Sequence, residues 1–359
     1  MENKGLLFIP DISGFTRFVN EIEIGHSQHI IRQLLEVLIN ANEAGLEISE
    51  IEGDAILFYK FGTPPDLPTL YRQVEKMFCE FHRHLNAYEH NKICQCRACT
   101  SAINLTLKVI THYGEFTTYQ IKNFSKLIGK DVIVAHQLLK NEIPQHEYWL
   151  VTDNLLEGTP PDLTQWMTWD TSAKQTETGD IPFHYTQLTE LKHLIPPEPE
   201  HPSVLEGKTK MLSVSRDYNV DLKVLFFTVV HFDFRHLWQT DLTTIDEVDH
   251  YLPGIGSRHR HVLKSGKEIM MSTNSFSYDP ENRVVFCETE ESSGNSTCYL
   301  IEKTGAHTSR LTIGLYFPKN PIRQLFFNIA AKKKMLADWH QSMENLDPLA
   351  TQMVLPVEF

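Results

Sequence analysis

A proline-rich stretch constrains the fold most, because it divides the chain into two parts that fold separately. Residues 191–210 contain four prolines and none of the apolar periodicity of a helix or strand. Pro-Pro and Glu-Pro steps favour extended backbone. At 359 residues the chain is long enough for two domains of roughly 100–200 residues each. We predict a first domain at residues 1–190, a linker at residues 191–210 and a second domain at residues 211–359.

The charge balance excludes one class of partner. The chain has 33 Lys and Arg against 46 Asp and Glu, a net charge of −13. Such a surface repels nucleic-acid phosphates and anionic headgroups, so we expect no nucleic-acid partner. No window approaches the roughly 20 apolar residues of a membrane helix, and the start of the chain lacks the apolar segment of about 7–15 residues found in signal peptides. We expect a cytoplasmic protein without membrane insertion.

The first part alternates segments typical of strands and helices. Strand-like segments lie at residues 5–9, 46–51, 55–59, 105–112 and 148–151, with a short one near Gln120, and helix-like segments lie at residues 27–44, 69–88 and 130–140. This β-α-β-β-α-β-type order predicts an α+β fold, a ferredoxin-like α/β sandwich with helices on one face of a mostly antiparallel sheet.

The second part reads mainly as strands followed by one long helix. The strand-like segments lie at residues 220–230, 257–263, 269–278, 283–289, 297–303 and 310–317. In residues 321–346 apolar side chains, among them Leu325, Phe326 and Ile329, recur at the three- and four-residue spacing of an amphipathic helix. This order predicts a curved antiparallel sheet wrapped on a C-terminal helix, a shape that can enclose an apolar cavity.

Two aspartates carry the clearest chemical signal. Asp11 follows an apolar strand, and Asp54 stands at the tip of a predicted hairpin. If those elements are neighbours, the two carboxylates converge at one sheet edge, where they suit Mg²⁺ or Mn²⁺ with substrate phosphate. Gly14 would let backbone amides approach a phosphate, and Gly53 would relieve the turn before Asp54. Both motifs are also ordinary turn sequences.

Three motifs, in order, resemble class III adenylate and guanylate cyclases. Residues 8–18, Phe-Ile-Pro-Asp-Ile-Ser-Gly-Phe-Thr-Arg-Phe, are similar to the first metal-binding strand of that family. Residues 50–59, Glu-Ile-Glu-Gly-Asp-Ala-Ile-Leu-Phe-Tyr, are similar to the second. Residues 108–115 and 124–138 fall where the family has a later strand, its tongue and a helix carrying an Asn and an Arg. The resemblance covers residues 4–152 and implies the nucleotide-cyclase type of sandwich.

The resemblance implies roles for the residues at matching positions. It implies metal ions, Mg²⁺ or Mn²⁺, held by Asp11, Asp54 and the backbone carbonyl of Ile12, which activate the ribose of a purine nucleoside triphosphate. It also implies a homodimer, because the sites of the family form across a dimer interface. The nucleotide-binding positions are Gly14, Phe15, Thr16, Glu50 and Lys126.

The chain departs from the family at the positions that stabilise the transition state. Ile133 and Gln137 stand where the family has its Asn and Arg. Ile133 cannot hydrogen-bond the ribose and Gln137 cannot neutralise charge on the α-phosphate, so the sequence argues against ordinary cyclase turnover. Glu50 and Lys126 align with the base-reading pair and would favour guanine, whereas the alternative is a solvated ion pair between them.

Three thiols lie within six residues, at Cys94, Cys96 and Cys99. Thiolates this close suit zinc. The spacing lacks the paired Cys-x-x-Cys of most zinc ribbons, so a redox or disulfide switch and simple reduced thiols remain alternatives. The candidate fourth zinc ligand is Cys79, His84 or His90.

Residues 212–346 resemble a START-like helix-grip domain. The resemblance rests on residues 218–230, a following Trp, the Gly-Ser-Arg turn at residues 256–258 and the final helix. It implies a hydrophobic small molecule held in a cavity under that helix. The candidate cavity residues are Phe226, Trp238, Phe326 and Trp339, although each can also be ordinary core.

Together the two resemblances describe a bacterial arrangement of a cyclase-like domain followed by a START-like domain. We expect a signalling protein that binds nucleotide and metal, in which an apolar ligand in the second domain modulates a cyclase-like homodimer. Two alternatives stay open. The protein is an active adenylate or guanylate cyclase, or it is a START-like carrier or enzyme whose first domain serves as a dimerisation platform.

Overall fold

The computed structural model describes residues 3–20, 24–122, 124–156, 158–176, 179–199, 203–248 and 254–355. It divides into two compact units, Met1–His90 with Arg97–Glu198 and Asn91–Cys96 with Pro199–Phe359. The main division falls inside the predicted linker. The short segment Asn91–Cys96, which we predicted within the first domain, belongs to the second unit, where Ile93 is buried in the core.

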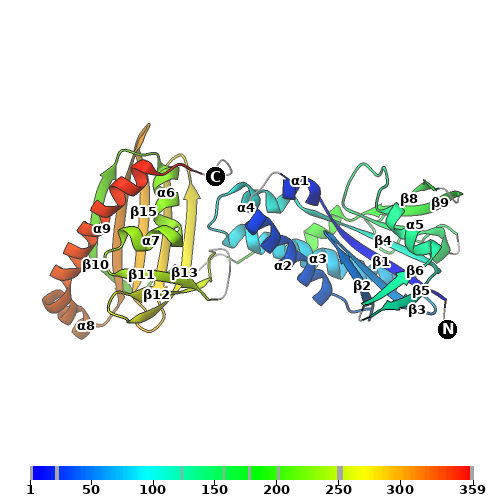
Figure 1. The fold of residues 1–359 in the computed structure, drawn as a ribbon, viewed down its shortest axis with the longest axis horizontal. Coiled ribbons are helices and arrows are strands. Elements are labelled where there is room, and N and C mark those ends of the chain that lie inside the picture. Colours follow the sequence, from blue (N-terminus) through cyan, green and yellow to red (C-terminus); the bar gives the residue numbers. More distant parts are fainter. Residues whose placement is uncertain are drawn as a thin grey trace. The chain divides into compact units, whose positions relative to one another are not determined.

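The first unit is built on a mixed β-sheet (Figure 1). Its strands are β1 (Lys4–Ser13), β2 (Glu47–Glu52), β3 (Ala55–Phe61), β4 (Thr106–Glu115), β5 (Thr117–Ile121), β6 (Phe124–Ile128), β7 (Tyr148–Thr152), β8 (Asp170–Thr176) and β9 (Gly179–Gln187). Its helices are α1 (Phe15–Asn20), α2 (Ile24–Asn40), α3 (Leu67–Asn91), α4 (Arg97–Ser101) and α5 (Lys130–Leu138), with short 3₁₀ turns η1 (Ala102–Asn104), η2 (Asp153–Leu155) and η3 (Thr189–Leu194). The sheet order is β2-β3-β1-β4-β7-β9-β8, with β4 and β7 parallel, and β5 and β6 form a separate hairpin.

Helices cover both faces of this sheet, where we predicted one. Tyr71 of α3 packs against Trp149 of β7, with ring centroids 6.2 Å apart. The next residue of β7, Leu150, shares a core with Leu138 of α5 on the opposite face. Residues 6–9 of β1 are buried throughout. Such an unbroken apolar run is typical of a strand covered on both faces, because one-sided cover produces alternation.

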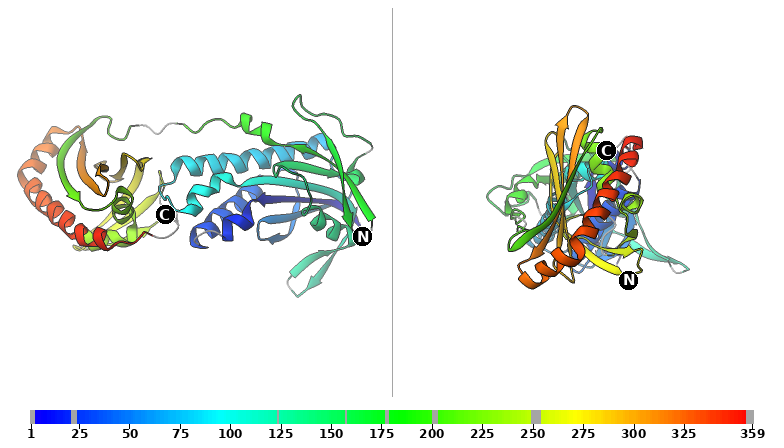
Figure 2. Two further views of the ribbon diagram at one scale, coloured as in Figure 1. Left: turned by 90° about the horizontal axis from the view of Figure 1, so that it is seen from above. Right: turned by 90° about the vertical axis from the view of Figure 1, so that its left-hand side faces the viewer.

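The second unit is one antiparallel sheet closed by a long C-terminal helix, as predicted. Its strands are β10 (Lys208–Tyr218), β11 (Leu242–Glu247), β12 (Arg258–Leu263), β13 (Glu268–Asp279), β14 (Arg283–Glu290), β15 (Ser296–Gly305) and β16 (Thr308–Pro318). Its helices are α6 (Leu222–Val230), α7 (Phe232–Trp238), α8 (Pro321–Phe326) and α9 (Lys332–Gln352), with the π-helical turn η4 (Phe327–Ala331) joining the last two. The sheet order is β10-β16-β15-β14-β13-β12-β11, and Figure 2 shows the sheet as curved.

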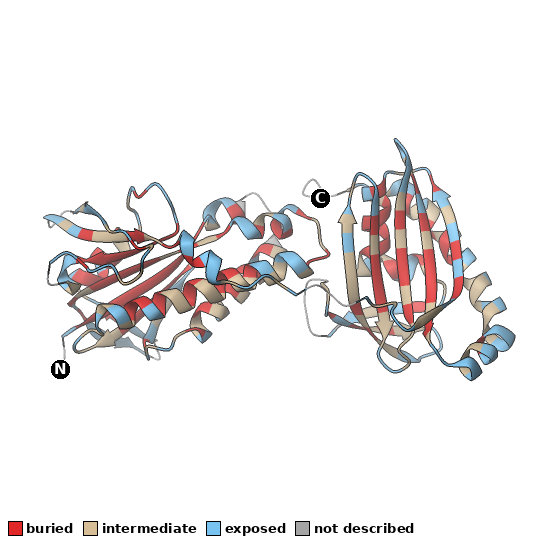
Figure 3. Ribbon diagram, turned by 180° about the vertical axis from the view of Figure 1, so that it is seen from behind, coloured by how far each residue is buried: buried red, intermediate tan, exposed pale blue. Residues whose placement is uncertain are grey.

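The apolar segment at residues 220–230 forms helix α6, where we predicted a strand. Leu225, Phe226 and Val229 of α6 are fully buried and join one core with Met343 and Leu346 of α9. Periodicity alone cannot distinguish a continuous apolar run in a buried helix from one in a buried strand. Figure 3 shows the buried residues of this unit concentrated on the strands and on the helix faces against them.

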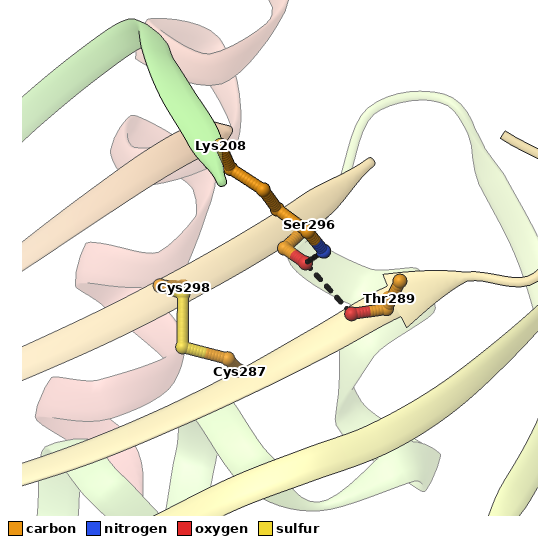
Figure 4. The surroundings of a disulfide bond; sticks show 5 residues. All are labelled: Lys208, Cys287, Thr289, Ser296 and Cys298. Carbon is orange, nitrogen blue, oxygen red and sulfur yellow. Dashed lines mark hydrogen bonds between the residues drawn. A yellow bond between two sulfur atoms is a disulfide. The ribbon is translucent and has the colours of Figure 1, made fainter. Parts of the chain in front are cut away.

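A disulfide joins two neighbouring strands of the second sheet (Figure 4). Cys287 on β14 and Cys298 on β15 are register partners, and their Cα atoms are 4.1 Å apart. Close by, the Oγ of Ser296 and the Oγ1 of Thr289 lie 2.7 Å apart across the same strands. Lys208 Nζ of β10 donates to Ser296 Oγ at 2.6 Å. These contacts tie β10, β14 and β15 together.

Candidate functional site

Asp11 and Asp54 lie on adjoining segments of the first sheet. Asp11, near the end of β1, is in register with Ala55 of β3. Asp54 stands in the turn before β3, directly after Gly53, whose φ of 63° favours glycine. The backbone N–H of Ile12 donates to the carbonyl oxygen of Asp54 at 3.0 Å. This bond holds the turn beside β1, so the structure brings the two aspartates together.

Both aspartates line an open cleft of about 850 Å³ in the first unit. At the junction of β1 and α1 the chain turns through Gly14, whose φ is 91°. The cleft receives most of the residues that the sequence assigned to metal and nucleotide. Those assigned residues that line it are Asp11, Ile12, Gly14, Phe15, Thr16, Asp54, Ile133 and Gln137.

Burial is the largest influence on the pKa values of the two aspartates of the cleft. Burial raises the pKa of Asp11 to about 6, the charge of Lys108 opposes this rise, and the charge of Asp54 adds to it. Burial also raises the pKa of Asp54. Lys108 Nζ lies 3.6 Å from Asp11 Oδ1 and donates to the carbonyl oxygen of Leu139 at 3.2 Å. One ammonium group therefore faces two carboxylates.

Sequence reasoning missed the basic residues of this cleft. The basic residues that line it are Arg17, Lys108, His136, Lys140 and His146. The register of the sheet would have found one of them, because Lys108 on β4 is the direct partner of Asp11 on β1. A basic residue opposite an acidic one across two central strands is a signal that appears once the strand pairing is known.

Helix α5 presents the two departures from the cyclase pattern to the cleft. Ile133 and Gln137 both line it, one turn apart. The side chain of Ile133 is 61% exposed, which is unusual for a large apolar residue. Neither side chain supplies the positive charge that a developing phosphate charge requires.

Glu50 and Lys126 bind one another. Lys126 Nζ on β6 donates to Glu50 Oε2 on β2 at 2.6 Å. Among the described residues, the set that lines the cleft includes neither of them. The geometry shows the ion pair of the alternative interpretation. One ligand atom of Glu50 also lies within 4.8 Å of atoms of Glu52 and His136, which line the cleft, so the base-reading role stays a prediction.

Four residues form a compact group with the chemistry of a metal site. One ligand atom from each of His26, Cys94, Cys96 and Cys99 lies within 4.8 Å of all the others. Within this group Cys99 Sγ is 3.5 Å from His26 Nδ1. Three sulfurs and one imidazole nitrogen are a ligand set that can hold a metal ion.

The structure corrects the predicted fourth ligand, because His26 occupies that place. Cys79 contacts the carbonyl oxygen of Leu191 through its Sγ at 3.9 Å, and burial raises the pKa of its thiol to about 11. Neither His84 nor His90 belongs to the group, as far as the described residues show. His26 lies about 70 residues before the thiols, where spacing gives no signal.

A cavity of about 250 Å³ lies beneath the start of α9 in the second unit. Two of the four predicted cavity residues, Trp238 and Trp339, line it. Phe226 instead packs in the core against Phe276, with ring centroids 5.9 Å apart. Phe326 lies on α8 with its side chain 71% exposed. The assignment of Phe226 and Phe326 to the cavity is therefore wrong.

A buried ion pair that the sequence did not reveal lies beside this cavity, whose lining includes Glu288. Arg235 Nη1 of α7 is 2.7 Å from Glu288 Oε1 of β14, and the two side chains are 1% and 2% exposed. The rings of Phe232, Phe286 and Tyr299 surround the guanidinium carbon at 5.2, 5.6 and 5.5 Å. Burial alone would raise the pKa of Glu288, but the charge and hydrogen bond of Arg235 together with His259 and His261 outweigh burial, and the pKa falls to about 2.

Two histidines of β12 complete this cluster. One ligand atom each of His259, His261 and Glu288 lies within 4.8 Å of the others. Burial lowers the pKa of His261 to about 3 and also lowers that of His259, so both rings are neutral near pH 7. Because Arg235 already neutralises Glu288, this cluster attracts a cation less than its residue types suggest.

The comparisons with known proteins identify a family. Residues 31–148 match the family model described as Protein of unknown function (DUF2652). Over 172 residues the chain is 30% identical to Uncharacterized protein Rv2561/Rv2562 of Mycobacterium tuberculosis (strain ATCC 25618 / H37Rv), covering 47% of this chain and 78% of that protein. The chain belongs to the DUF2652 family.

The match to the DUF2652 model covers only part of the cleft. It includes Asp54, Lys108, Ile133 and Gln137, and it begins after Asp11. It also includes the three clustered thiols, whereas the sheet of the second unit lies beyond it. The family description therefore concerns the first unit of this DUF2652 protein.

The N-terminal half of the DUF2652 chain is similar in fold to class III nucleotidyl cyclase domains. The guanylate cyclase domain of RhGC from Catenaria anguillulae in complex with GTP is 15% identical, with a TM-score of 0.36, and the match covers 52% of this chain and 97% of that one. The adenylyl cyclase CyaB from P. aeruginosa is 12% identical, with a TM-score of 0.33 and coverages of 51% and 93%. At these identities the likeness concerns the fold alone.

Proposed function

We propose that the first unit binds a purine nucleoside triphosphate together with a divalent cation at Asp11 and Asp54. The observation that carries this proposal is the placement of two desolvated carboxylates in one open cleft. Lys108 Nζ lies 3.6 Å from Asp11 Oδ1, and this single ammonium group does not balance both carboxylates. Two desolvated carboxylates that share one ammonium group and open to solvent favour a cation.

A divalent metal fits this set of donors. Carboxylate oxygens are the ligands that Mg²⁺ and Mn²⁺ favour, and the raised pKa of Asp11, about 6, means that its ionised form lacks compensation. Asp11, Asp54 and the backbone carbonyl of Ile12 would hold the ion. A bound metal would supply charge neutralisation for the phosphates of the nucleotide.

The walls of the cleft suit a triphosphate. The left-handed backbone at Gly14 leaves room where the chain passes from β1 into α1, and Phe15 and Thr16 follow on the same wall. Lys108 and Lys140 bring positive charge to the same cleft. A polyanionic ligand would therefore meet basic side chains beside the metal ligands.

We propose binding without efficient cyclisation. The positions that face the reacting phosphate in the cyclase pattern are Ile133 and Gln137, and both line the cleft. Loss of a single preorganised donor to developing charge typically costs about 100- to 1000-fold in turnover. The cleft thus retains the groups for binding, whereas the two positions of the cyclase Asn and Arg carry no group that stabilises the transition state.

We propose further that the second unit is a START-like domain that binds a hydrophobic small molecule and thereby modulates a homodimer of the first unit. The order of elements supports this, because two helices follow the first strand and one long helix follows the last. The cavity beneath α9 offers Trp238 and Trp339 to an apolar body, and His261 and Glu288 to a polar group. Small-molecule sites commonly combine an apolar lining with few polar groups.

For the group of His26, Cys94, Cys96 and Cys99 we propose zinc, because three thiolates and an imidazole are a common zinc ligand set. Metal analysis of the purified protein should find zinc, and Cys96→Ser should remove it. The matched control is Cys79→Ser, which alters a thiol outside the group and should leave the zinc in place. Zinc content that is absent, or unchanged by Cys96→Ser, would contradict this assignment.

One experiment tests the nucleotide proposal. The protein is incubated with Mn²⁺ and either GTP or ATP, bound nucleotide is measured by equilibrium dialysis, and 3′,5′-cyclic product is sought by mass spectrometry. We expect metal-dependent binding that Asp54→Ala abolishes and that Glu36→Ala, a control at an exposed carboxylate of α2 outside the cleft lining, preserves. Cyclic product that disappears in Asp54→Ala would instead make the protein an active cyclase. Binding that survives Asp54→Ala would contradict the proposed site.

A further inference from the structure

Four large apolar side chains stand in solvent at the start of the C-terminal helical run. Ile322, Leu325, Phe326 and Ile329 are 83%, 62%, 71% and 78% exposed. Their spacing of three and four residues puts them on one face of a helix, which we call the α8 stripe. Figure 3 shows this end of the run mainly in the colour of exposed residues. An apolar stripe left in solvent marks a surface that meets a partner.

A π-helical turn accounts for the outward direction of the α8 stripe. In a regular helix, residues such as Ile329 would continue the face on which Leu336 and Trp339 pack against the sheet. The turn η4 takes one residue more per hydrogen bond, which rotates the stripe by roughly 100° relative to α9. Phe327 is buried in its place, with its ring 4.9 Å from that of Phe317.

Basic residues flank the α8 stripe. From Lys319 to Lys334 the chain has five Lys and Arg residues and no Asp or Glu, although its net charge is −13. Lys333 and Lys334 are exposed. Apolar side chains bordered by basic ones fit an anionic lipid surface. A second copy of the chain fits poorly, because a symmetric contact would bring two basic sets together.

The same turn borders the cavity of the second unit. Phe327 and Ala331 of η4 line the cavity together with Met335 and Trp339 of α9. The α8 stripe therefore lies on the outer side of a helical run whose inner side faces the cavity.

We propose that the α8 stripe and its flanking lysines dock the second unit on an anionic membrane surface. In the described part of the chain, no helix is both long and apolar enough to cross a membrane. The stripe therefore lies in the plane of the lipid interface, with its apolar side chains among the headgroups and its lysines beside lipid phosphates. This docking goes beyond the proposed function and does not depend on the ligand of the cavity.

Flotation of the full-length protein with lipid vesicles tests the proposal. We compare vesicles of phosphatidylcholine with vesicles in which about one third of the lipid is phosphatidylglycerol. We expect binding to the anionic vesicles that falls as salt is added, because lysine–headgroup attraction is screened. The double variant Leu325→Glu/Ile329→Glu should bind at least about tenfold more weakly. A triple change of Lys332, Lys333 and Lys334 to Gln should remove the preference for phosphatidylglycerol.

The matched control places the same charge at another exposed leucine. Leu194 of η3 is 60% exposed, and Leu194→Glu should leave vesicle binding unchanged. Sedimentation velocity on the same variants reports self-association. Wild-type protein that fails to float with anionic vesicles would overturn the proposal. So would stripe variants that lose self-association and keep vesicle binding, because the stripe would then contact a second copy.

Discussion

Asp11 in the first unit and Glu288 in the second are both carboxylates removed from water, yet their pKa values move in opposite directions. Burial is the largest influence on each. The pKa of Asp11 rises to about 6, because Lys108 at 3.6 Å does not offset burial and the neighbouring Asp54. The pKa of Glu288 falls to about 2, because the charge and hydrogen bond of Arg235 at 2.7 Å, together with His259 and His261, outweigh burial.

This difference indicates which of the two carboxylates can bind a cation. Glu288 lies close to His259 and His261, a set of ligand types that a metal can use. Its charge is already neutralised within the protein, so a metal there would have to displace a guanidinium. The charge of Asp11 is not fully compensated by its neighbours, and its cleft is open to solvent. Ligand types alone would favour the Glu288 cluster as the cation site. The charge compensation of the two carboxylates favours the Asp11 cleft instead.

The largest effect should follow from removing the partner of Glu288. Arg235→Met leaves a carboxylate buried without its cation, which should lower the free energy of unfolding of the second unit by about 3–5 kcal/mol. Urea unfolding followed by tryptophan fluorescence measures this loss. The double variant Arg235→Met/Glu288→Leu is the control and should recover most of it. A single variant no less stable than the double would show that the pair is not coupled.

A smaller effect should appear in mild acid, and it should distinguish the two units. The folded-state pKa of His261 lies near 3, below its ordinary value of 6.5, so the unfolded chain takes up the proton first. Stability is therefore full above about pH 6.5 and is lost as the pH falls toward 3, by about 1–2 kcal/mol at pH 5 for one such histidine. Asp11 acts in the opposite sense, because protonating it below pH 6 removes a buried charge from the first unit.

Hydrogen exchange with mass spectrometry at pH 7 and pH 5 reports on each unit separately. His82 in the first unit also has its pKa lowered to about 3 by burial, so that unit loses some stability as well. In the second unit the losses at His259 and His261 add together, and the raised pKa of Asp241, which is due mainly to burial, offsets part of them. We expect β12 and β14 to lose protection first. Loss of protection in β1 and β4 before β12 and β14 would contradict the expected difference between the two units.

The smallest effect belongs to Glu50, a carboxylate paired at the surface. Lys126→Met breaks its 2.6 Å ion pair, but the lysine is half exposed, with 51% of its side chain accessible. We expect no measurable change in melting temperature and no change in the ratio of GTP to ATP binding. A marked shift of that ratio in a nucleotide competition assay would restore the base-reading role of Glu50 and Lys126.

Local patterns predicted the parts of the molecule that short segments specify. The turn at Gly53 and Asp54, the apolar strand before Asp11 and the long C-terminal helix all follow from a few neighbouring residues. The two-sided cover of the first sheet was readable in the apolar run at residues 6–9, yet we predicted helices on one face. Strands β8 and β9 were not predicted, because their exposed, polar residues give little apolar alternation.

Contacts between distant segments were beyond local patterns. Lys108 meets Asp11 through strand pairing, and Arg235 meets Glu288 across more than fifty residues. His26 joins the thiols from a helix far earlier in the chain. The exposed direction of Phe326 depends on one π turn, which shifts a regular apolar pattern by a residue. Predicting each of these features requires knowing which distant segments pack together, and local sequence patterns do not contain that information.

Calorimetric titration with Mn²⁺ tests the central claim most directly, that the cation site is the Asp11 cleft and not the Glu288 cluster. The wild type is compared with Asp11→Asn, which removes one charge from the cleft, and with His261→Gln, which removes a ligand from the cluster. Thiolates bind Mn²⁺ poorly, so the His/Cys group does not obscure the signal. We predict that Mn²⁺ binding is lost in Asp11→Asn and kept in His261→Gln. Binding kept in Asp11→Asn and lost in His261→Gln would contradict the account.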